Sequence, residues 1–72
     1  MNYTDSISKN IKEFRVKNNM TQSELAYQVG VHVTHISQIE LECKVNIGIR
    51  TIIKLCTAIN MSIDELVGFK HD

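Results

Sequence analysis

Residues 21–40 read Thr-Gln-Ser-Glu-Leu-Ala-Tyr-Gln-Val-Gly-Val-His-Val-Thr-His-Ile-Ser-Gln-Ile-Glu. This stretch predicts two short helices separated by Gly30, where the backbone takes a positive φ that glycine adopts at little cost. The first helix opens at Thr21, because Thr21 and Glu24 have the spacing of a capping box, in which each side chain satisfies a free backbone N–H near the other residue. The inward face of this helix consists of small and branched apolar residues, Leu25, Ala26 and Val29.

The second helix of this pair is expected from about His32 to Glu40. Ile36 and Ile39 have the three-residue spacing of one helical face and point to the core. The remaining positions are left for solvent or a partner: Val33, Thr34, His35, Ser37 and Gln38. A row of small polar side chains on the second of two such helices indicates a surface that meets DNA.

Three further helices flank this pair. The first is expected from about residue 5 to residue 17, capped by Thr4 or Asp5 and ended at Asn18-Asn19, since asparagine tolerates left-handed geometry. Its apolar stripe consists of Ile7, Ile11 and Phe14. The fourth helix is expected over about residues 49–59, closed by Asn60, with inward positions at Ile49, Ile52, Ile53, Cys56 and Ile59. The fifth covers about residues 63–67, and a capping box of Ser62 and Glu65 opens it.

The chain has 72 residues, which leaves room for a single domain with a core over about residues 5–68 and a tail, residues 69–72, that is expected to fray. No stretch shows the strict alternation of a half-buried strand, so we expect a compact, all-α, five-helix bundle. No apolar run approaches the ~20 residues that cross a bilayer, and the N-terminus lacks the features of a signal peptide. We therefore expect a cytoplasmic protein without a membrane partner.

The formal net charge is zero, which argues mildly against binding to nucleic acid. The basic residues nevertheless gather in two runs, one within residues 9–17 and one within residues 44–54. Two such patches can flank a binding face although the total charge cancels. Scattered surface charge is the alternative interpretation.

From Ile11 to Leu66 the chain resembles the phage-repressor and Cro type of helix-turn-helix domain, the XRE family, whose best-known fold is that of the lambda repressor. The matching residues are Arg15, Thr21-Gln22-Ser23-Glu24-Leu25-Ala26, Gly30-Val31, Ile36-Ser37-Gln38-Ile39-Glu40, and Thr51 through Leu66 with its Ser-Ile-Asp-Glu-Leu ending. The resemblance implies a five-helix bundle whose third helix enters the major groove of double-stranded DNA, usually as a homodimer on a palindrome.

The resemblance also implies roles for individual residues. Val33, Thr34 and Gln38 match positions that read bases, and His35 and Ser37 lie beside them; Gln38 can pair with adenine, and Val33 and Thr34 can touch a thymine methyl group. Arg15 and Glu40 match an ion pair between the first helix and the end of the third. The expected phosphate-binding residues are Gln22, Arg15, Lys44 and Asn46.

The sequence departs from the family pattern in two places. The loop after Glu40 runs Leu41-Glu42-Cys43-Lys44-Val45-Asn46-Ile47-Gly48, without the usual Asn-Gly, and it adds a negative charge at Glu42. The third helix contains no arginine or lysine, so the common contact from arginine to guanine is missing there. This composition favours contacts with A·T base pairs and binding as a dimer.

No site for a metal, a cofactor, a small-molecule effector or catalysis is expected. His32, His35 and Cys43 lie near one another in sequence, but a zinc site takes about four ligands and no fourth has a credible spacing. Cys43 and Cys56 are expected to be free thiols, with Cys56 on an apolar helical face. No histidine and serine are placed as base and nucleophile, so the chain is not expected to be an enzyme.

The sequence therefore favours a sequence-specific, DNA-binding transcriptional regulator, and more narrowly a repressor. Leu66, Val67 and Phe69 are expected to form a dimer contact, although Phe69 could instead fold back onto the first helix. The alternative function is a protein-interaction module, antitoxin-like or anti-repressor, that uses the same fold without DNA. Salt dependence separates the two functions, because phosphate contacts make affinity fall steeply as salt rises.

Overall fold

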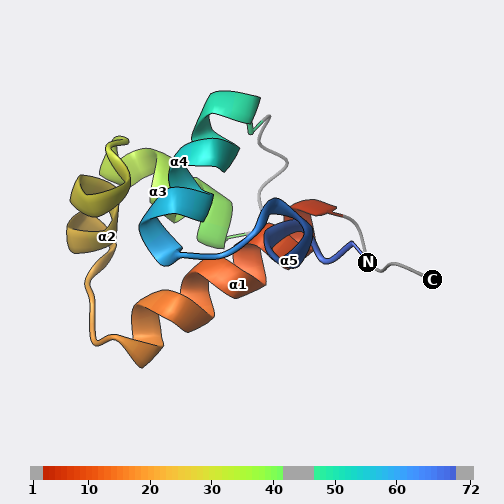
Figure 1. The fold of residues 1–72 in the computed structure, drawn as a ribbon. Helices are drawn as coiled ribbons and strands as arrows, with labels where there is room; N and C mark the ends of the chain where they lie inside the picture. The colour runs from red at the N-terminus through yellow and green to blue at the C-terminus, as the bar shows by residue number, and fades with distance from the viewer. Residues whose placement is uncertain (1–2, 42–46, 70–72) are drawn as a thin grey trace.

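The computed structural model describes residues 3–41 and 47–69, and five α-helices and no strand occur in those two ranges. They are α1 (Tyr3–Lys17), α2 (Gln22–Val29), α3 (Val33–Glu40), α4 (Ile49–Ile59) and α5 (Ile63–Val67) (Figure 1). The expected all-α, five-helix fold is thus confirmed. None of the helices in the described ranges combines the length and the apolar character needed to cross a membrane.

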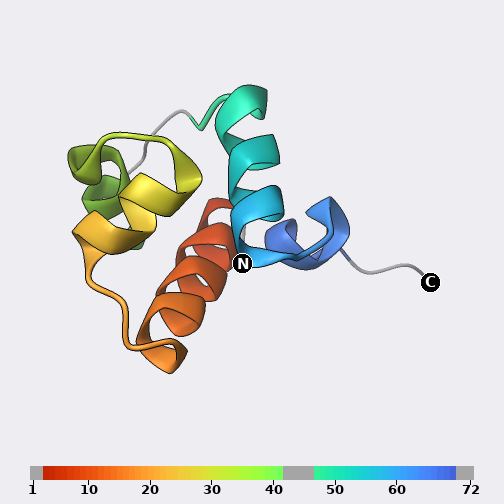
Figure 2. The ribbon, with the colours of Figure 1, turned by 60° about the vertical axis from the view of Figure 1, so that its left-hand side comes forward.

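The five helices pack around one core. α1 contacts both α3 and α5, while α2 contacts α3 and α4, and α4 contacts α5. Figure 2 shows α2 and α3 on one side of α4 and α5 on the other. Each of the five helices therefore packs against two others. The largest fully buried apolar side chains come from all five helices: Ile11, Leu25, Ile36, Ile39, Leu55 and Leu66.

Local signals set the helix boundaries. Thr21 and Glu24 form the predicted capping box at the start of α2, and Ser62 forms another with Glu65 at the start of α5. Gly30 ends α2 with a φ of 87°. Asn19 and Asn60 both have a φ of 54°, so asparagine takes the left-handed conformation after α1 and after α4.

The predicted start of the first helix is wrong. α1 already begins at Tyr3, so Thr4 and Asp5 lie within its first turn and neither residue is its N-cap. A carboxylate in the first turn still interacts favourably with the free N–H groups there. Asp5 is therefore favourable in the first turn. An aspartate near a helix start fits either an N-cap or a first-turn position, which is why the predicted start was wrong.

Two of the predicted core positions of α4 are also wrong. Ile49 is 64% exposed and Ile53 is 56% exposed, whereas Leu55, which was not predicted, is fully buried with Ile59. The apolar arc of α4 is wider than the part that the neighbouring helices cover. Periodicity finds the arc but does not decide which of its edges faces the core.

Candidate nucleic-acid interface

The start of α3 is fixed by His32. As the N-cap residue, His32 accepts the backbone N–H of Thr34 on its ring nitrogen Nδ1, with a distance of 3.4 Å. Such an acceptor satisfies one of the N–H groups that a helix start leaves free. His32 thus has a structural role at the beginning of the helix that carries the predicted base-reading residues.

The predicted base-reading residues differ in how far their side chains are exposed. Thr34 and Gln38 are exposed, while His35 and Ser37 are half-buried. Val33 is also half-buried, and it packs against the hydrophobic core. Thr34 and Gln38 are therefore the side chains of α3 that project farthest from the molecule.

One outward residue was missed in the sequence. Leu41, the C-cap of α3, is 70% exposed. Thr34, Gln38 and Leu41 follow the i, i+4, i+7 spacing of one helical face, opposite the buried Ile36 and Ile39. We call these three residues the α3 outer stripe. The same spacing rule would have found Leu41 if the stripe had been continued past the end of the expected helix.

Arg15 and Glu40 lie together at the corner where α1 meets the end of α3. Arg15 Nε donates to Glu40 Oε2 at 2.7 Å, and Arg15 Nη2 donates to Glu40 Oε1 at 2.9 Å. This hydrogen bond raises the pKa of Arg15, against the opposing effect of its partial burial. The Glu40 side chain is only 4% exposed, so the fork of the guanidinium is the partner that compensates its charge.

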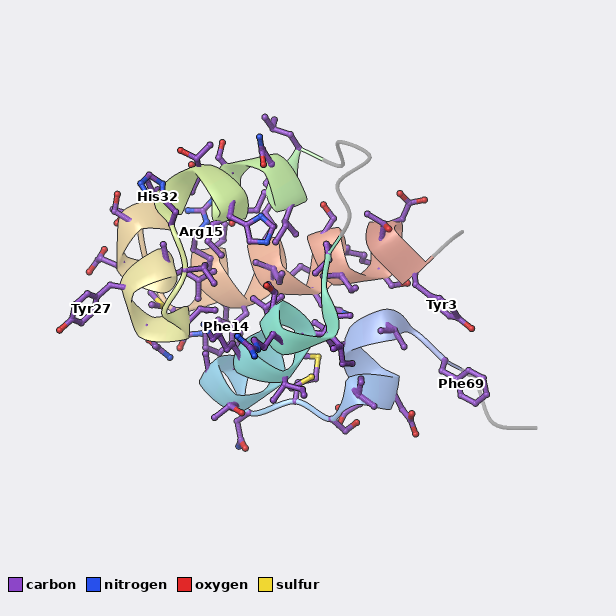
Figure 3. The ribbon with its side chains drawn as sticks, turned by 90° about the horizontal axis from the view of Figure 1, so that it is seen from above. Tyr3, Phe14, Arg15, Tyr27, His32 and Phe69 are labelled. Carbon is purple, nitrogen blue, oxygen red and sulfur yellow. The ribbon has the colours of Figure 1, made fainter. Side chains whose placement is uncertain are left out.

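The same corner includes the start of α2. Gln22, the first residue of α2, donates from Nε2 to Glu40 Oε1 at 3.3 Å. Arg15 Nη1 donates to the backbone oxygen of Met20 at 2.9 Å. Figure 3 shows Arg15 between α1 and α3. The network of Arg15, Gln22 and Glu40, which we call the corner network, therefore joins α1, α2 and α3.

Two other predicted phosphate-binding residues, Lys44 and Asn46, lie outside the described residues, as does Cys43. Cys56 is a free, half-buried cysteine, and burial raises the pKa of its thiol. Within the two described ranges, no group of three or more His, Cys, Asp or Glu residues has the arrangement to hold a metal ion.

The predicted dimer contact is partly wrong. Leu66 is fully buried in the core of its own chain, so it is not on the surface. Val67 is half-buried, and Phe69 is 48% exposed. Figure 3 shows Phe69 and Tyr3 at the opposite end of the molecule from Tyr27. Sequence reasoning took Leu66 for a surface residue because it did not place α5 against α1.

The exposed cations of the described residues belong to α1 and α4, and Lys54 reaches the turn before α3, because its Nζ donates to the backbone oxygen of Gly30 at 3.4 Å. Lys9, Lys12 and Lys17 are exposed on α1, and Arg50 and Lys54 are exposed on α4. α3 itself carries neither lysine nor arginine. Its outer stripe therefore offers an amide, a hydroxyl and an aliphatic side chain to a partner, and among residues 3–41 and 47–69 the positive charge comes from α1 and α4.

Comparisons with known proteins agree with this geometry. The sequence matches the helix-turn-helix family over residues 11–66. It is 31% identical to the control protein C.SmaI of Serratia marcescens, over all of this chain and 88% of that protein. The fold is similar to a hypothetical transcription factor NHTF from Neisseria, with a TM-score of 0.78 and 30% identity over 89% of this chain and 72% of that one. It is also similar to SinR, the master regulator for biofilm formation, in complex with DNA, with a TM-score of 0.74 and 30% identity over 83% of this chain and 95% of that one.

Proposed function

This chain belongs to the helix-turn-helix family of DNA-binding transcriptional regulators, of the XRE (Cro/C1) type, and we propose that it is a repressor that binds a palindromic operator as a homodimer. In this proposal α3 lies in the major groove, where a helix of this motif makes its base contacts. A dimer seated on a promoter excludes other proteins from the same stretch of groove, which is the simplest way for a bound domain to repress.

The observation that carries the proposal is the α3 outer stripe beside the corner network. Thr34, Gln38 and Leu41 are exposed on the side of α3 opposite its buried residues. Gln22, the first residue of α2, is held at the end of α3 by its hydrogen bond to Glu40. A groove-reading surface needs this combination, because base edges are read by the helix while phosphate contacts fix its position.

Each residue of this surface has a distinct proposed role. Gln38 pairs through its amide with adenine, and Thr34 and Leu41 touch thymine methyl groups. Gln22 binds a phosphate at the start of α2, where free N–H groups favour an anion. Arg15 turns the remaining edge of its guanidinium to a phosphate of the same DNA strand. Lys44 and Asn46 are proposed as further phosphate contacts. Because α3 has no arginine or lysine, the operator is expected to be rich in A·T base pairs.

The homodimer is proposed to form through α4 and α5. These two helices contact each other and both expose apolar side chains. The exposed or half-buried members are Ile49, Ile53, Ile63, Val67 and Phe69. The Ala58 side of α4 faces α2, since Ala58 packs against the core and Gln28 of α2 donates to its backbone oxygen at 2.9 Å. Ile49 lies on the other side of the helix from Ala58. We propose that a second copy of this chain covers this apolar surface, because it also supplies a second α3 for the other half-site of the operator.

The proposal is tested by selecting bound sequences from random DNA duplexes. A repressor of this kind yields a two-fold symmetric, A·T-rich motif whose half-sites are about one helical turn apart. A single half-site or an enriched pool without a motif contradicts the palindrome. If affinity for the selected duplex does not fall as salt rises, phosphate contacts are absent and the interaction-module alternative, favoured by the lack of lysine and arginine in α3, replaces DNA binding.

A further inference from the structure

The side chain of Glu40 accepts from three donors at once, two on Arg15 and one on Gln22, the residue proposed to bind phosphate at the start of α2. Arg15 occupies both carboxylate oxygens, and Gln22 Nε2 shares Oε1 at 3.3 Å. We propose that Glu40 is a positioning residue for DNA binding, because it fixes which end of the Gln22 amide faces the phosphate. The inference rests on the proposed DNA-binding function and adds a specific role for a buried carboxylate.

The argument depends on the two ends of an amide. A glutamine side chain carries an oxygen that only accepts hydrogen bonds and an NH2 group that donates two. An ionised carboxylate only accepts, so Glu40 can pair with the nitrogen of Gln22 and not with its oxygen. One N–H of Gln22 then points to Glu40, and the second stays on the same nitrogen, available to a phosphate oxygen.

Without Glu40 the Gln22 amide can turn over. In the reversed orientation the amide oxygen lies where the phosphate binds, and two acceptors then face each other. Holding the amide nitrogen in place before DNA arrives removes the free-energy cost of ordering it during binding. Gln22 is half-buried at the start of α2, so its position is already limited and the remaining freedom is chiefly the orientation of its amide.

Arg15 makes this arrangement compatible with DNA. A bare carboxylate beside a phosphate would repel it, but Glu40 is 4% exposed and paired with Arg15 through two hydrogen bonds. Arg15 Nη1 also holds the backbone oxygen of Met20, just before α2. The corner network therefore fixes both the backbone before Gln22 and the side chain of Gln22, while its two charges compensate each other.

The orientation is tested first in the free protein by NMR of the side-chain amide groups. Gln28 and Gln38 are internal references, because Gln28 Nε2 donates to Ala58 at 2.9 Å whereas Gln38 is exposed on α3. We expect one Nε2 proton of Gln22 to exchange with water more slowly than those of Gln38. We also expect that Glu40→Gln abolishes this protection and leaves Gln28 unchanged. Exchange of Gln22 as fast as that of Gln38 in the unaltered protein would overturn the proposal without the need for any variant.

The consequence for DNA is tested with the duplex obtained by selection. Glu40→Gln and Gln22→Ala are each expected to weaken binding roughly three- to tenfold, the range of one hydrogen bond. The loss caused by Glu40→Gln should be clearly smaller in the Gln22→Ala background than in the unaltered protein, because Glu40 acts in part through Gln22 and in part through Arg15. Circular dichroism and urea unfolding of each variant show whether it is folded at the temperature of the binding measurement.

The outcomes separate the two claims. Losses that add in the double variant would mean that Glu40 acts on DNA independently of Gln22, and the positioning role would be wrong. If neither the unaltered protein nor any variant binds a selected duplex, the proposed function fails. Slow exchange of the Gln22 amide protons would in that case still show that Glu40 orients the amide. Gln28→Ala is the matched control, since its amide lies between α2 and α4.

Discussion

Gln38 carries a donor and an acceptor on one amide, and its side chain is exposed on the α3 outer stripe. Helical spacing in the sequence predicted that Thr34 and Gln38 face outward, and the resemblance to the helix-turn-helix family predicted the Arg15–Glu40 pair. It did not identify the bond from Gln22 to Glu40, because that contact depends on how α2 and α3 cross and on the conformations of both side chains. It also treated Val33 as a base-reading residue, although packing against the core leaves Val33 only half exposed.

Replacing Gln38 with alanine tests base reading by a single residue. We expect Gln38→Ala to weaken binding to the selected operator about tenfold or more, since a two-bond contact to adenine contributes roughly 1–3 kcal/mol of discrimination. Affinities are measured at fixed salt for the operator and for duplexes with each A·T pair changed. Gln28→Ala is the control. Equal losses for the two variants would mean that Gln38 does not read a base.

Helix boundaries follow from local chemistry, whereas the orientation of a helix in the bundle does not. The caps at Thr21, Gly30, Asn60 and Ser62 lie where the sequence predicts them, because a cap involves only a few neighbouring residues. The buried side of α4 was predicted less well. Whether Ile53 or Leu55 faces the core depends on how α4 packs against α2 and α5, which residue spacing within α4 does not encode.

Two glycine substitutions should change stability in opposite directions. Gly30→Ala is expected to lower the free energy of unfolding by about 1–2 kcal/mol, because alanine is strained at a φ of 87° even though nothing lies within 4 Å of its added Cβ. Gly48→Ser is expected to raise it by about 0.5–1 kcal/mol, since the start of α4 has no side-chain cap. Urea unfolding measures both, and a loss of stability in the serine variant would contradict this account of the α4 cap.

The capping box of α2 should make stability depend on pH. Hydrogen bonds from the backbone and then the side chain of Thr21 lower the pKa of Glu24 from its ordinary value of 4.5. The resulting stabilisation is present above the pKa of the unfolded chain and is lost as the pH falls through the lower pKa of the folded state. Thermal unfolding between pH 6 and about pH 3 should therefore show a smaller decrease for Glu24→Gln than for the unaltered protein. Parallel curves would exclude a contribution from Glu24.

At the scale of the whole molecule, the proposed homodimer would bury the exposed apolar side chains of α4. Ile49 is 64% exposed and Ile53 is 56% exposed, and both lie on α4, which contacts α5. The sequence suggested a dimer but placed Leu66 in it, because pattern alone does not separate an interface from a core. A core and a homodimer interface are both rich in apolar residues, so composition alone does not tell them apart.

Breaking the α4–α5 surface should separate dimerisation from folding. We expect Ile53→Ser to shift the protein to monomers in sedimentation experiments and to weaken operator binding, with the free energy of unfolding of the monomer nearly unchanged because the side chain is exposed. Val16→Ser is the control, since Val16 is an exposed apolar residue of α1. The same sedimentation profile for both variants and the unaltered protein would contradict a dimer through α4.

The claim that α3 meets DNA is tested most directly by NMR titration of the isotope-labelled protein with the selected duplex. The account predicts that the largest changes in chemical shift, and contacts to thymine methyl and adenine protons, occur at Thr34, Gln38 and Leu41, with further changes at Gln22. Changes confined to the exposed lysines of α1, with the α3 outer stripe unaffected, would contradict it.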